Sequence, residues 1–179
     1  MTTPAIMLDI EALDIRPTAA IASIGAVLFE PHTDWIGNTF HIHVSLENCQ
    51  RHGLTLGAST VTWWLGQDDS PRQTLINGQL YAAPLITALE ALAAFIPTDA
   101  EIWCNGNSYD LPIIAHAYHA CGIETPWRFY NERDLRTLKG LNKGLRIERN
   151  GTHHNALDDA VHQARLVQHI LQFNSDIDA

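Results

Sequence analysis

Apolar and polar residues alternate along residues 5–11, the first patterned stretch of the chain. A period of two is typical of a β-strand and separates the side chains onto two faces. The apolar face carries Ile6, Leu8 and Ile10. Asp9 and Glu11 fall on the opposite face, close together near the end of the strand. Two adjacent carboxylates repel each other unless a cation lies between them, so the pair indicates either a divalent-metal site or a solvated strand face.

Two more strands are predicted directly after this stretch. Residues 20–29 are apolar on both faces, which is typical of a strand buried inside a sheet, and Ser23 and Gly25 leave room beside it. Residues 39–44 alternate again, with histidines on the polar face, which predicts an edge strand. Because the connections are short, we expect the three strands to form an antiparallel meander.

Helical periodicity dominates the remainder of the chain. The pattern predicts helices over residues 60–66, 85–96, 109–121, 134–141 and 156–173, a short helix after Asp68, and short strands over residues 102–104 and 128–130. Ser108 is the expected N-cap of the helix that follows it, and the glycines within residues 140–151 predict a loop. This order of elements predicts an α/β layer fold with a mixed sheet covered by helices.

Length and composition indicate one globular domain over residues 1–179. Hydrophobic residues make up 46% of the chain and charged residues 17%, which excludes the composition of a disordered protein. There is no run of about 18 apolar residues and no basic region followed by an apolar stretch at the N-terminus, so we expect neither a membrane span nor a signal peptide. Three cysteines without metal-ligand spacing predict reduced thiols in a cytoplasmic protein.

The net charge of −9 argues against a general nucleic-acid coat protein. The basic residues are unevenly distributed, however, because residues 133–149 contain six of the eleven lysines and arginines. These are Arg133, Arg136, Lys139, Lys143, Arg146 and Arg149. An acidic protein with one such basic segment can still bind a polyanion there, so we expect the segment to guide a nucleic-acid backbone.

Asp110 lies in the first turn of the helix predicted after Ser108. The residues that share its row are Ile114, Ala117 and Cys121. Because this row is apolar, helical phase directs Asp110 toward the interior. A carboxylate is also favoured at a helix N-terminus by the helix dipole, so a plain capping acid is the alternative interpretation.

Two adjacent aspartates begin the last predicted helix, and helical phase separates them. Asp158 shares a polar row with His162, Arg165 and His169, so we expect it to face solvent. The row of Asp159 continues through Gln163, Leu166 and Ile170. Asp159 is therefore directed inward, where a carboxylate needs a partner. Two histidines, His153 and His154, lie just before this helix and are candidates for catalysis, although surface histidines are common and the local pattern does not choose between them.

Five of these residues together resemble the active-site motif of the DnaQ-like 3′–5′ exonucleases of the DEDDh type. The motif is Asp9-x-Glu11, then Asp110 at the start of a helix, then His154-x-x-x-x-Asp159, and it extends over nearly the whole chain. Other short stretches of the sequence are similar to those of a phage and bacterial subgroup of this family. That subgroup includes the phage exonuclease DexA and proteins labelled exodeoxyribonuclease VIII. The similar stretches occupy residues 16–19, 23–27, 63–64, 105–106 and 133–137.

The resemblance implies a ribonuclease-H-like fold and hydrolysis of single-stranded nucleic acid from its 3′ end to 5′-mononucleotides, with DNA the favoured substrate. It implies that two Mg²⁺ or Mn²⁺ ions are held by Asp9, Glu11, Asp110 and Asp159 and that His154 is the general base. Relatives are often homodimers, which leaves a homodimer open for this chain.

The resemblance also indicates residues for substrate binding. They are Trp63, Trp64, Asn105, Tyr109, Arg133 and Arg136. Adjacent aromatic residues on a helix point about 100° apart, so at most one of the two tryptophans is expected to stack on a base while the other packs in the core. Tyr109 has packing as its alternative, and the two arginines are either phosphate ligands or partners of Asp134 and Glu132 in structural ion pairs.

Two positions depart from the pattern of the family. Ala12 stands where many relatives carry threonine after the glutamate, and Asp14 stands where glycine is common. The first change removes a hydroxyl group near the substrate's 3′ end, and the second adds a negative charge there.

Three other functions remain as alternatives. An exoribonuclease that trims RNA or short oligoribonucleotides would use the same residues, because a 2′-hydroxyl contact can come from a backbone group. A non-catalytic nucleic-acid-binding module predicts the loss of at least one motif residue, and all five are present. A structural protein without a site would leave the inward carboxylates at Asp110 and Asp159 unexplained.

Overall fold

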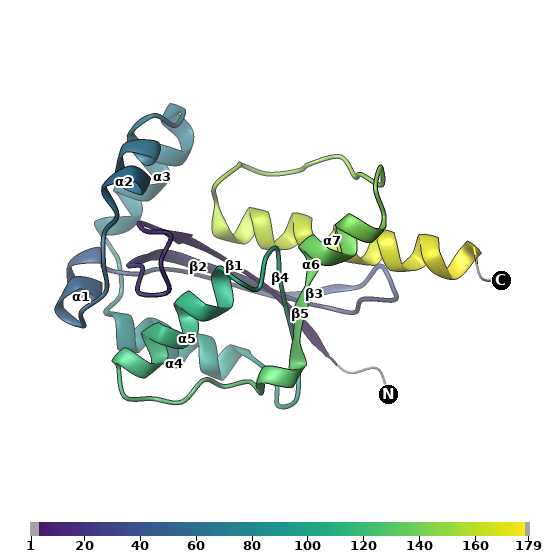
Figure 1. Cartoon of the computed structure of the whole chain (residues 1–179), viewed down its shortest axis with the longest axis horizontal. Coiled ribbons are helices and arrows are strands. Elements are labelled where there is room, and N and C mark those ends of the chain that lie inside the picture. The colour runs from purple at the N-terminus through teal and green to yellow at the C-terminus, as the bar shows by residue number, and fades with distance from the viewer. Residues whose placement is uncertain (1–3, 178–179) are drawn as a thin grey trace.

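The computed structural model describes residues 4–177, in which five strands form one mixed sheet with helices on both faces (Figure 1). The strands are β1 (Ala5–Ala12), β2 (Ile21–Phe29), β3 (Ile36–His43), β4 (Glu101–Cys104) and β5 (Glu132–Asp134). Their order across the sheet is β3-β2-β1-β4-β5, with β1, β2 and β3 antiparallel and β4 and β5 running parallel to β1. The predicted meander and the mixed sheet are confirmed.

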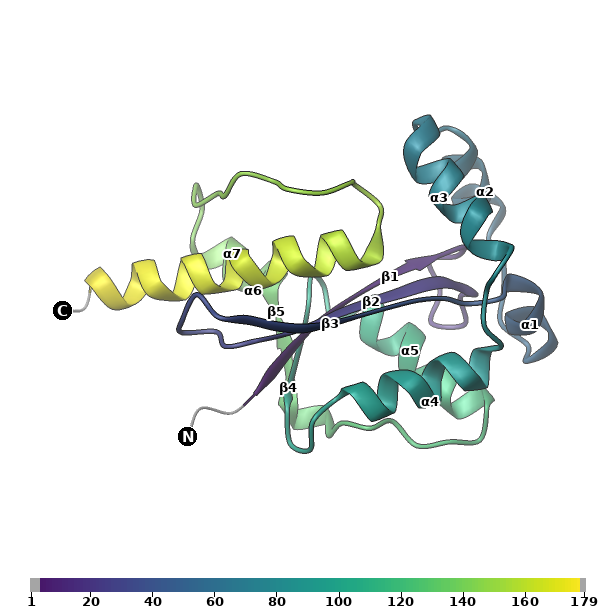
Figure 2. The same cartoon turned by 180° about the vertical axis from the view of Figure 1, so that it is seen from behind.

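Seven α-helices cover this sheet within the described residues. They are α1 (Leu46–Arg51), α2 (Ala58–Leu65), α3 (Asp69–Gln79), α4 (Leu85–Phe95), α5 (Asp110–Ala120), α6 (Leu135–Leu141) and α7 (Ala156–Ile177). Figures 1 and 2 show α4 and α5 on one face of the sheet, α6 and α7 on the other, and α2 and α3 beside one end. In residues 4–177, none of these helices is both long and apolar enough to cross a membrane.

Strand β1 supplies side chains to two separate hydrophobic cores. Ile6, Leu8 and Ile10 pack with residues of α4 and α5 in the first core. Met7, on the other face, packs with residues of α6 and α7 in the second. The predicted alternation is therefore correct, and Asp9 and Glu11 share with Met7 the face of the sheet that α7 covers.

Gly25 allows α7 to approach the sheet closely. It lies opposite Asp9 in the β1–β2 register. A Cβ atom at this position would collide with the backbone of Ala156 and Leu157 in the first turn of α7. The missing side chain thus brings the beginning of α7, and with it Asp159, over the strand that carries Asp9.

Gly25→Ala is expected to lower the free energy of unfolding by about 1–3 kcal/mol, the usual cost of overpacking a tight interior. The backbone atoms that meet the new Cβ cannot rotate away as a side chain could, so α7 must shift. Urea denaturation monitored by circular dichroism measures the change. Gly140→Ala is the matched control, because a Cβ there meets nothing within 4 Å. Equal denaturation midpoints for the two variants would contradict this account of the approach.

Three local predictions were wrong. Residues 128–130 were predicted to form a strand, but Phe129–Asn131 form a short 3₁₀-helix and the strand follows it as β5. Phe129 is 81% exposed, and the charged residues of β5 pair with β4 through their backbone. The N-cap of α5 is Tyr109 in place of Ser108, and helix α1 was not predicted.

Candidate active site

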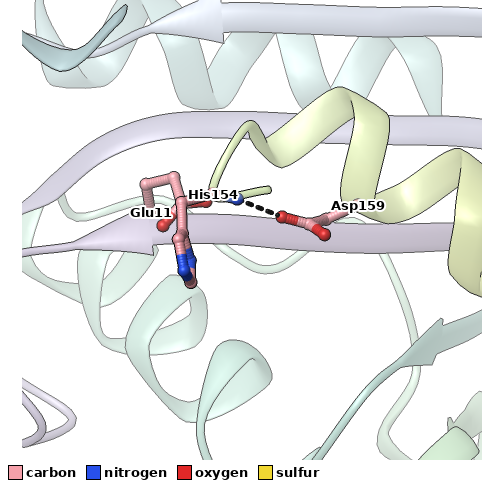
Figure 3. A group of neighbouring side chains, drawn as sticks. All are labelled: Glu11, His154 and Asp159. Carbon is pink, nitrogen blue, oxygen red and sulfur yellow. Dashed lines mark hydrogen bonds between the residues drawn. The ribbon is translucent and has the colours of Figure 1, made fainter. Parts of the chain in front are cut away.

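The candidate carboxylates come from three elements, β1, α5 and α7. Asp9 and Glu11 lie on β1, Asp110 begins α5 and is buried, and Asp159 lies in the first turn of α7. Side-chain ligand atoms of Glu11, His154 and Asp159 all lie within 4.8 Å of one another. Figure 3 shows Glu11 and Asp159 on the two sides of the backbone segment that carries His154.

Burial raises the pKa values of three of these acids, and repulsion from neighbouring carboxylates adds to this effect. The pKa of Asp9 lies well above its ordinary value because the group is buried and because Asp110, Glu11 and Asp159 repel its charge. Burial, with Asp159 and Asp110, raises the pKa of Glu11 to about 8. Burial also raises the pKa of Asp110 to about 7, against backbone hydrogen bonds and the charge of Arg136. Such a cluster has the charge and the oxygen atoms that a divalent cation requires.

Asp159 connects the helix to the loop that carries His154. Its Oδ2 accepts a hydrogen bond of 3.0 Å from the backbone N–H of His154 (Figure 3), and its Oδ1 accepts one from Arg149. His154 has φ of 59°, a left-handed conformation that is unfavourable for a histidine and is found at functional sites. Its ring packs edge-on against Trp63 and Trp64, with centroid distances of 5.0 and 6.1 Å. Both the backbone and the ring of His154 are thus held in place.

Asp158 also contacts this loop, contrary to the expectation that it faces solvent. Its carboxylate is half-buried, and Oδ2 accepts a hydrogen bond of 2.7 Å from the backbone N–H of Thr152. At the first turn of α7, the polar row of the helix lies against the loop between α6 and α7. This loop therefore covers part of the row. Asp158 therefore has a structural role that helical phase alone did not predict, while the neighbouring His153 is exposed.

Gln163 is a residue of the site that the sequence interpretation missed. Its side chain is buried, and Nε2 donates a hydrogen bond of 2.7 Å to Asp9 Oδ1. Its Oε1 is buried and has no hydrogen-bond partner among residues 4–177. Gln163 lies one turn after Asp159 in the same inward row, and this polar residue on an otherwise apolar stripe was the available signal.

A cavity of about 490 Å³ lies beside the carboxylates. It is lined by Ile10, Glu11, Ala12, Ile15, Ser59, Thr60, Trp63, Trp64 and Tyr109. Trp63 is 45% exposed, whereas Trp64 is buried and donates from Nε1 to the carbonyl oxygen of Ala12 at 3.2 Å. One tryptophan of the pair therefore has a free surface at the cavity and the other packs in the core, the division that their spacing predicts.

Tyr109 combines the two interpretations offered for it. It lines the cavity, and its hydroxyl group donates a hydrogen bond of 3.1 Å to the carbonyl oxygen of Asp14.

Asn105 lies directly after β4, and its carbonyl oxygen accepts a hydrogen bond of 3.0 Å from Arg136. The side-chain Oδ1 of Asn105 is buried and has no hydrogen-bond partner in the described part of the chain. The charge of Arg136 acts on Asp110, so this arginine lies near the site.

Arg133 differs from Arg136 in its partners. Its guanidinium group forms a 2.7 Å ion pair with Glu101 and donates to the carbonyl oxygens of Tyr130 and Glu132. Of the two alternatives, these contacts favour a structural ion pair, although its partner is Glu101 and not the side chain of Asp134 or Glu132. The side chain of Arg133 is nevertheless 38% exposed, so its role in substrate binding stays a prediction.

Asp14 does not present a free negative charge to the site. Its side chain is buried, and its carboxylate accepts hydrogen bonds from Arg16 at 2.8 Å and from Thr55 at 2.7 Å. The bond from Arg16 is the main reason that the pKa of Asp14 falls to about 2. The departure from glycine adds an ion pair with Arg16 inside the β1–β2 loop and a hydrogen bond that ties this loop to Thr55, where the sequence suggested a charge facing the substrate.

The metal-free protein is expected to lose stability as the pH rises from about 5 to about 8. In this range the folded state keeps protons on Glu11 and Asp110 that the unfolded chain has released, so deprotonation favours unfolding. Urea unfolding in the presence of a chelator measures the effect. The lowered pKa values of His41 and His43 make the protein more stable as the pH rises, which opposes the effect of the acids. The test is therefore the difference between the pH dependence of the free energy of unfolding in wild type and in Glu11→Gln. Parallel pH profiles for these two proteins would contradict the prediction.

Comparison with known proteins adds a family and a set of similar folds. A family model described as "3'-5' exoribonuclease Rv2179c-like domain" matches residues 4–171. The nuclease domain of 3′hExo, a DEDDh family member bound to rAMP, is similar with a TM-score of 0.65 at 17% identity, over 96% of this chain and 93% of that chain. No curated protein matches the chain.

Two further solved structures are longer than this chain. The zinc-bound form of E. coli ExoI in complex with ssDNA has a TM-score of 0.72 at 9% identity, over 99% of this chain and 42% of that chain. A 3′-exonuclease structure described by its recognition of the histone mRNA stem-loop has a TM-score of 0.68 at 15% identity, over 96% of this chain and 64% of that chain. The chain thus spans less than two thirds of both, and at these identities the likeness concerns the fold.

Proposed function

Because the chain belongs to the family of 3′–5′ exoribonuclease Rv2179c-like domains, we propose that its carboxylate cluster is the divalent-metal site of a 3′–5′ exonuclease. Family membership and the ribonuclease-H-like fold confirm the resemblance to DEDDh nucleases and the assignment as a nuclease. The observation that carries the proposal is the convergence of Glu11, His154 and Asp159 within 4.8 Å, beside acids whose pKa values are raised.

The residues present fit divalent metal ions. Oxygen ligands of the required kind come from Asp9, Glu11, Asp110 and Asp159, and Mg²⁺ or Mn²⁺ are the ions that such ligands favour. When bound, the ions would supply Lewis-acid stabilisation of the phosphate and activation of water. Their charge would also offset the repulsion that raises the pKa values of Asp9 and Glu11.

His154 is proposed to accept the proton of the attacking water. Its side-chain nitrogen lies beside Glu11 and Asp159, and its ring orientation is held by the two tryptophans. A general base needs such a fixed position within reach of the nucleophile. Gln163 is proposed to orient Asp9 through the hydrogen bond to Oδ1.

The cavity beside Trp63 is proposed to receive the terminal base of a single-stranded nucleic acid. Stacking on an exposed tryptophan is sequence-tolerant because every base has a π-face, which suits an enzyme that removes successive nucleotides. The adjoining position of Glu11 brings the cavity next to the carboxylates.

RNA trimming is a second candidate, and the family description favours it. DNA was the substrate favoured by the motif resemblance, and the side chains of the site do not decide between the two, since a backbone group can contact the 2′-hydroxyl. We therefore propose single-stranded nucleic acid as the substrate class, with the sugar preference to be measured.

The proposal is tested with 5′-labelled DNA and RNA oligonucleotides of one sequence, incubated with Mg²⁺, Mn²⁺ or a chelator. We expect the labelled strand to shorten by one nucleotide at a time from its 3′ end, with release of 5′-mononucleotides. The reaction is expected to require the metal. A circular single strand is the matched control and is expected to stay intact. Cleavage of the circle, or full activity in the chelator, would contradict the proposal.

A further inference from the structure

Arg149 makes an ion pair with one of the proposed metal ligands. Its Nη2 donates to Asp159 Oδ1 and, at 3.3 Å, to the carbonyl oxygen of Thr152. The side chain of Arg149 is only 20% exposed and that of Asp159 only 15%. Arg149 Nε is buried and has no hydrogen-bond partner among the residues that the structure describes. The guanidinium group is therefore desolvated by its position beside the carboxylate and only partly satisfied by hydrogen bonds.

Arg149 contacts the same carboxylate group that is proposed to bind a metal ion. Asp159 Oδ2 accepts the backbone N–H of His154 and Oδ1 accepts Arg149, so an ion that binds through Oδ1 meets the guanidinium group there. A guanidinium group and a divalent cation cannot both lie directly against this atom in the same direction, because their charges repel each other. Binding of the ion through Oδ1 is therefore opposed as long as Arg149 stays on this oxygen.

We propose that Arg149 is a displaceable counter-cation, which neutralises Asp159 in the metal-free protein and competes with the divalent ion for Oδ1. This inference rests on the metal site proposed above. Competition of this kind weakens the apparent metal affinity, because each ion that binds must break the ion pair. Arg149 thereby sets the metal concentration at which the site is filled.

The connections of the loop allow this exchange without releasing His154. The loop between α6 and α7 is fastened to α7 by two bonds that do not involve Arg149, namely Thr152 N–H to Asp158 and His154 N–H to Asp159 Oδ2. Loss of the Arg149 contacts leaves both in place. The displaced guanidinium group would then lie beside the site as an additional positive charge.

Mn²⁺ titration of wild type and Arg149→Met by isothermal calorimetry tests the inference. Methionine has a side chain of similar length without the charge or the donors. The expected result is Mn²⁺ binding about tenfold tighter in Arg149→Met, the factor that corresponds to about 1.4 kcal/mol. Arg136→Met is the matched control, because it removes a charge near Asp110 whose guanidinium group donates to a carbonyl oxygen and not to a proposed ligand.

The possible outcomes separate competition from simpler effects. Equal tightening in Arg149→Met and Arg136→Met would show a long-range charge effect and would overturn the inference. Weaker binding in Arg149→Met would overturn it as well, because Arg149 would then be needed to orient Asp159. If wild type and both variants bind no Mn²⁺, the metal site itself fails, a result distinct from a bound ion whose affinity is independent of Arg149.

A second measurement uses the unaltered protein. The side-chain Nε–H resonance of Arg149, assigned by its loss in Arg149→Met, is expected to exchange slowly with solvent without metal, because Nε is buried. Addition of Mg²⁺ is expected to shift this resonance and to accelerate its exchange. An unchanged resonance at a Mg²⁺ concentration that saturates the site would show that Arg149 stays on Asp159 and would overturn the inference.

Discussion

Glu11→Gln is expected to abolish hydrolysis and to remove most of the rise in melting temperature that divalent metal produces in the wild type. Glutamine has the shape of glutamate but lacks the charge that binds a cation. In the absence of metal the same variant is expected to be more stable than wild type at pH 8, because it removes a buried charge that Asp159 and Asp110 also repel. Opposite effects on stability and activity distinguish a ligand from a residue that only supports the fold.

Thermal unfolding with Mn²⁺ or a chelator, together with a hydrolysis assay, measures both effects. Glu124→Gln is the matched control, since Glu124 is exposed and lies on the loop that follows α5. It is expected to match the wild type in both assays. A Glu11→Gln protein that keeps the full metal-dependent stabilisation would exclude Glu11 as a metal ligand.

His154→Ala is expected to reduce kcat by roughly 10²–10⁴-fold while leaving metal binding nearly unchanged. The reduction would follow from the loss of the proposed general base. Metal binding persists because the carboxylates remain and because Asp159 is held through the backbone N–H of residue 154, which alanine retains. Steady-state kinetics and Mn²⁺ calorimetry measure the two quantities.

His153→Ala is the matched control for this variant. His153 is exposed and adjacent to His154, and its removal is expected to leave kcat close to that of the wild type. Because His154 also lies within 4.8 Å of two ligand carboxylates, it could itself be a ligand. Loss of metal affinity in His154→Ala would support that alternative and contradict its role as a general base.

Local periodicity was sufficient to predict the elements that build the site. The alternation in β1 placed Asp9 and Glu11 on one face, and helical phase directed Asp110 inward in α5, where it is buried. These predictions succeed because the direction of a side chain within a strand or helix depends only on its own element. The two tryptophans of α2 were separated into a buried and an exposed side chain for the same reason.

Contacts between distant segments could not be predicted in this way. Gln163 and Asp9 are 154 residues apart, and their hydrogen bond depends on how closely α7 packs on the sheet. The ion pair of Arg133 with Glu101 spans 32 residues and depends on the pairing of β4 with β5. The hydrogen bond that Asp158 accepts from the loop before α7 likewise results from tertiary structure. The polar row of α7, which was predicted to face solvent, is therefore partly covered.

The location of manganese in crystals soaked with Mn²⁺, identified by anomalous diffraction, tests the central claim most directly. The account predicts two ions about 4 Å apart, bounded by Asp9, Glu11, Asp110 and Asp159, with Arg149 turned away from Asp159. The same crystals soaked with Mg²⁺ provide the control for the anomalous signal. Manganese bound elsewhere, or no manganese between these carboxylates at a concentration that supports hydrolysis, would contradict the account.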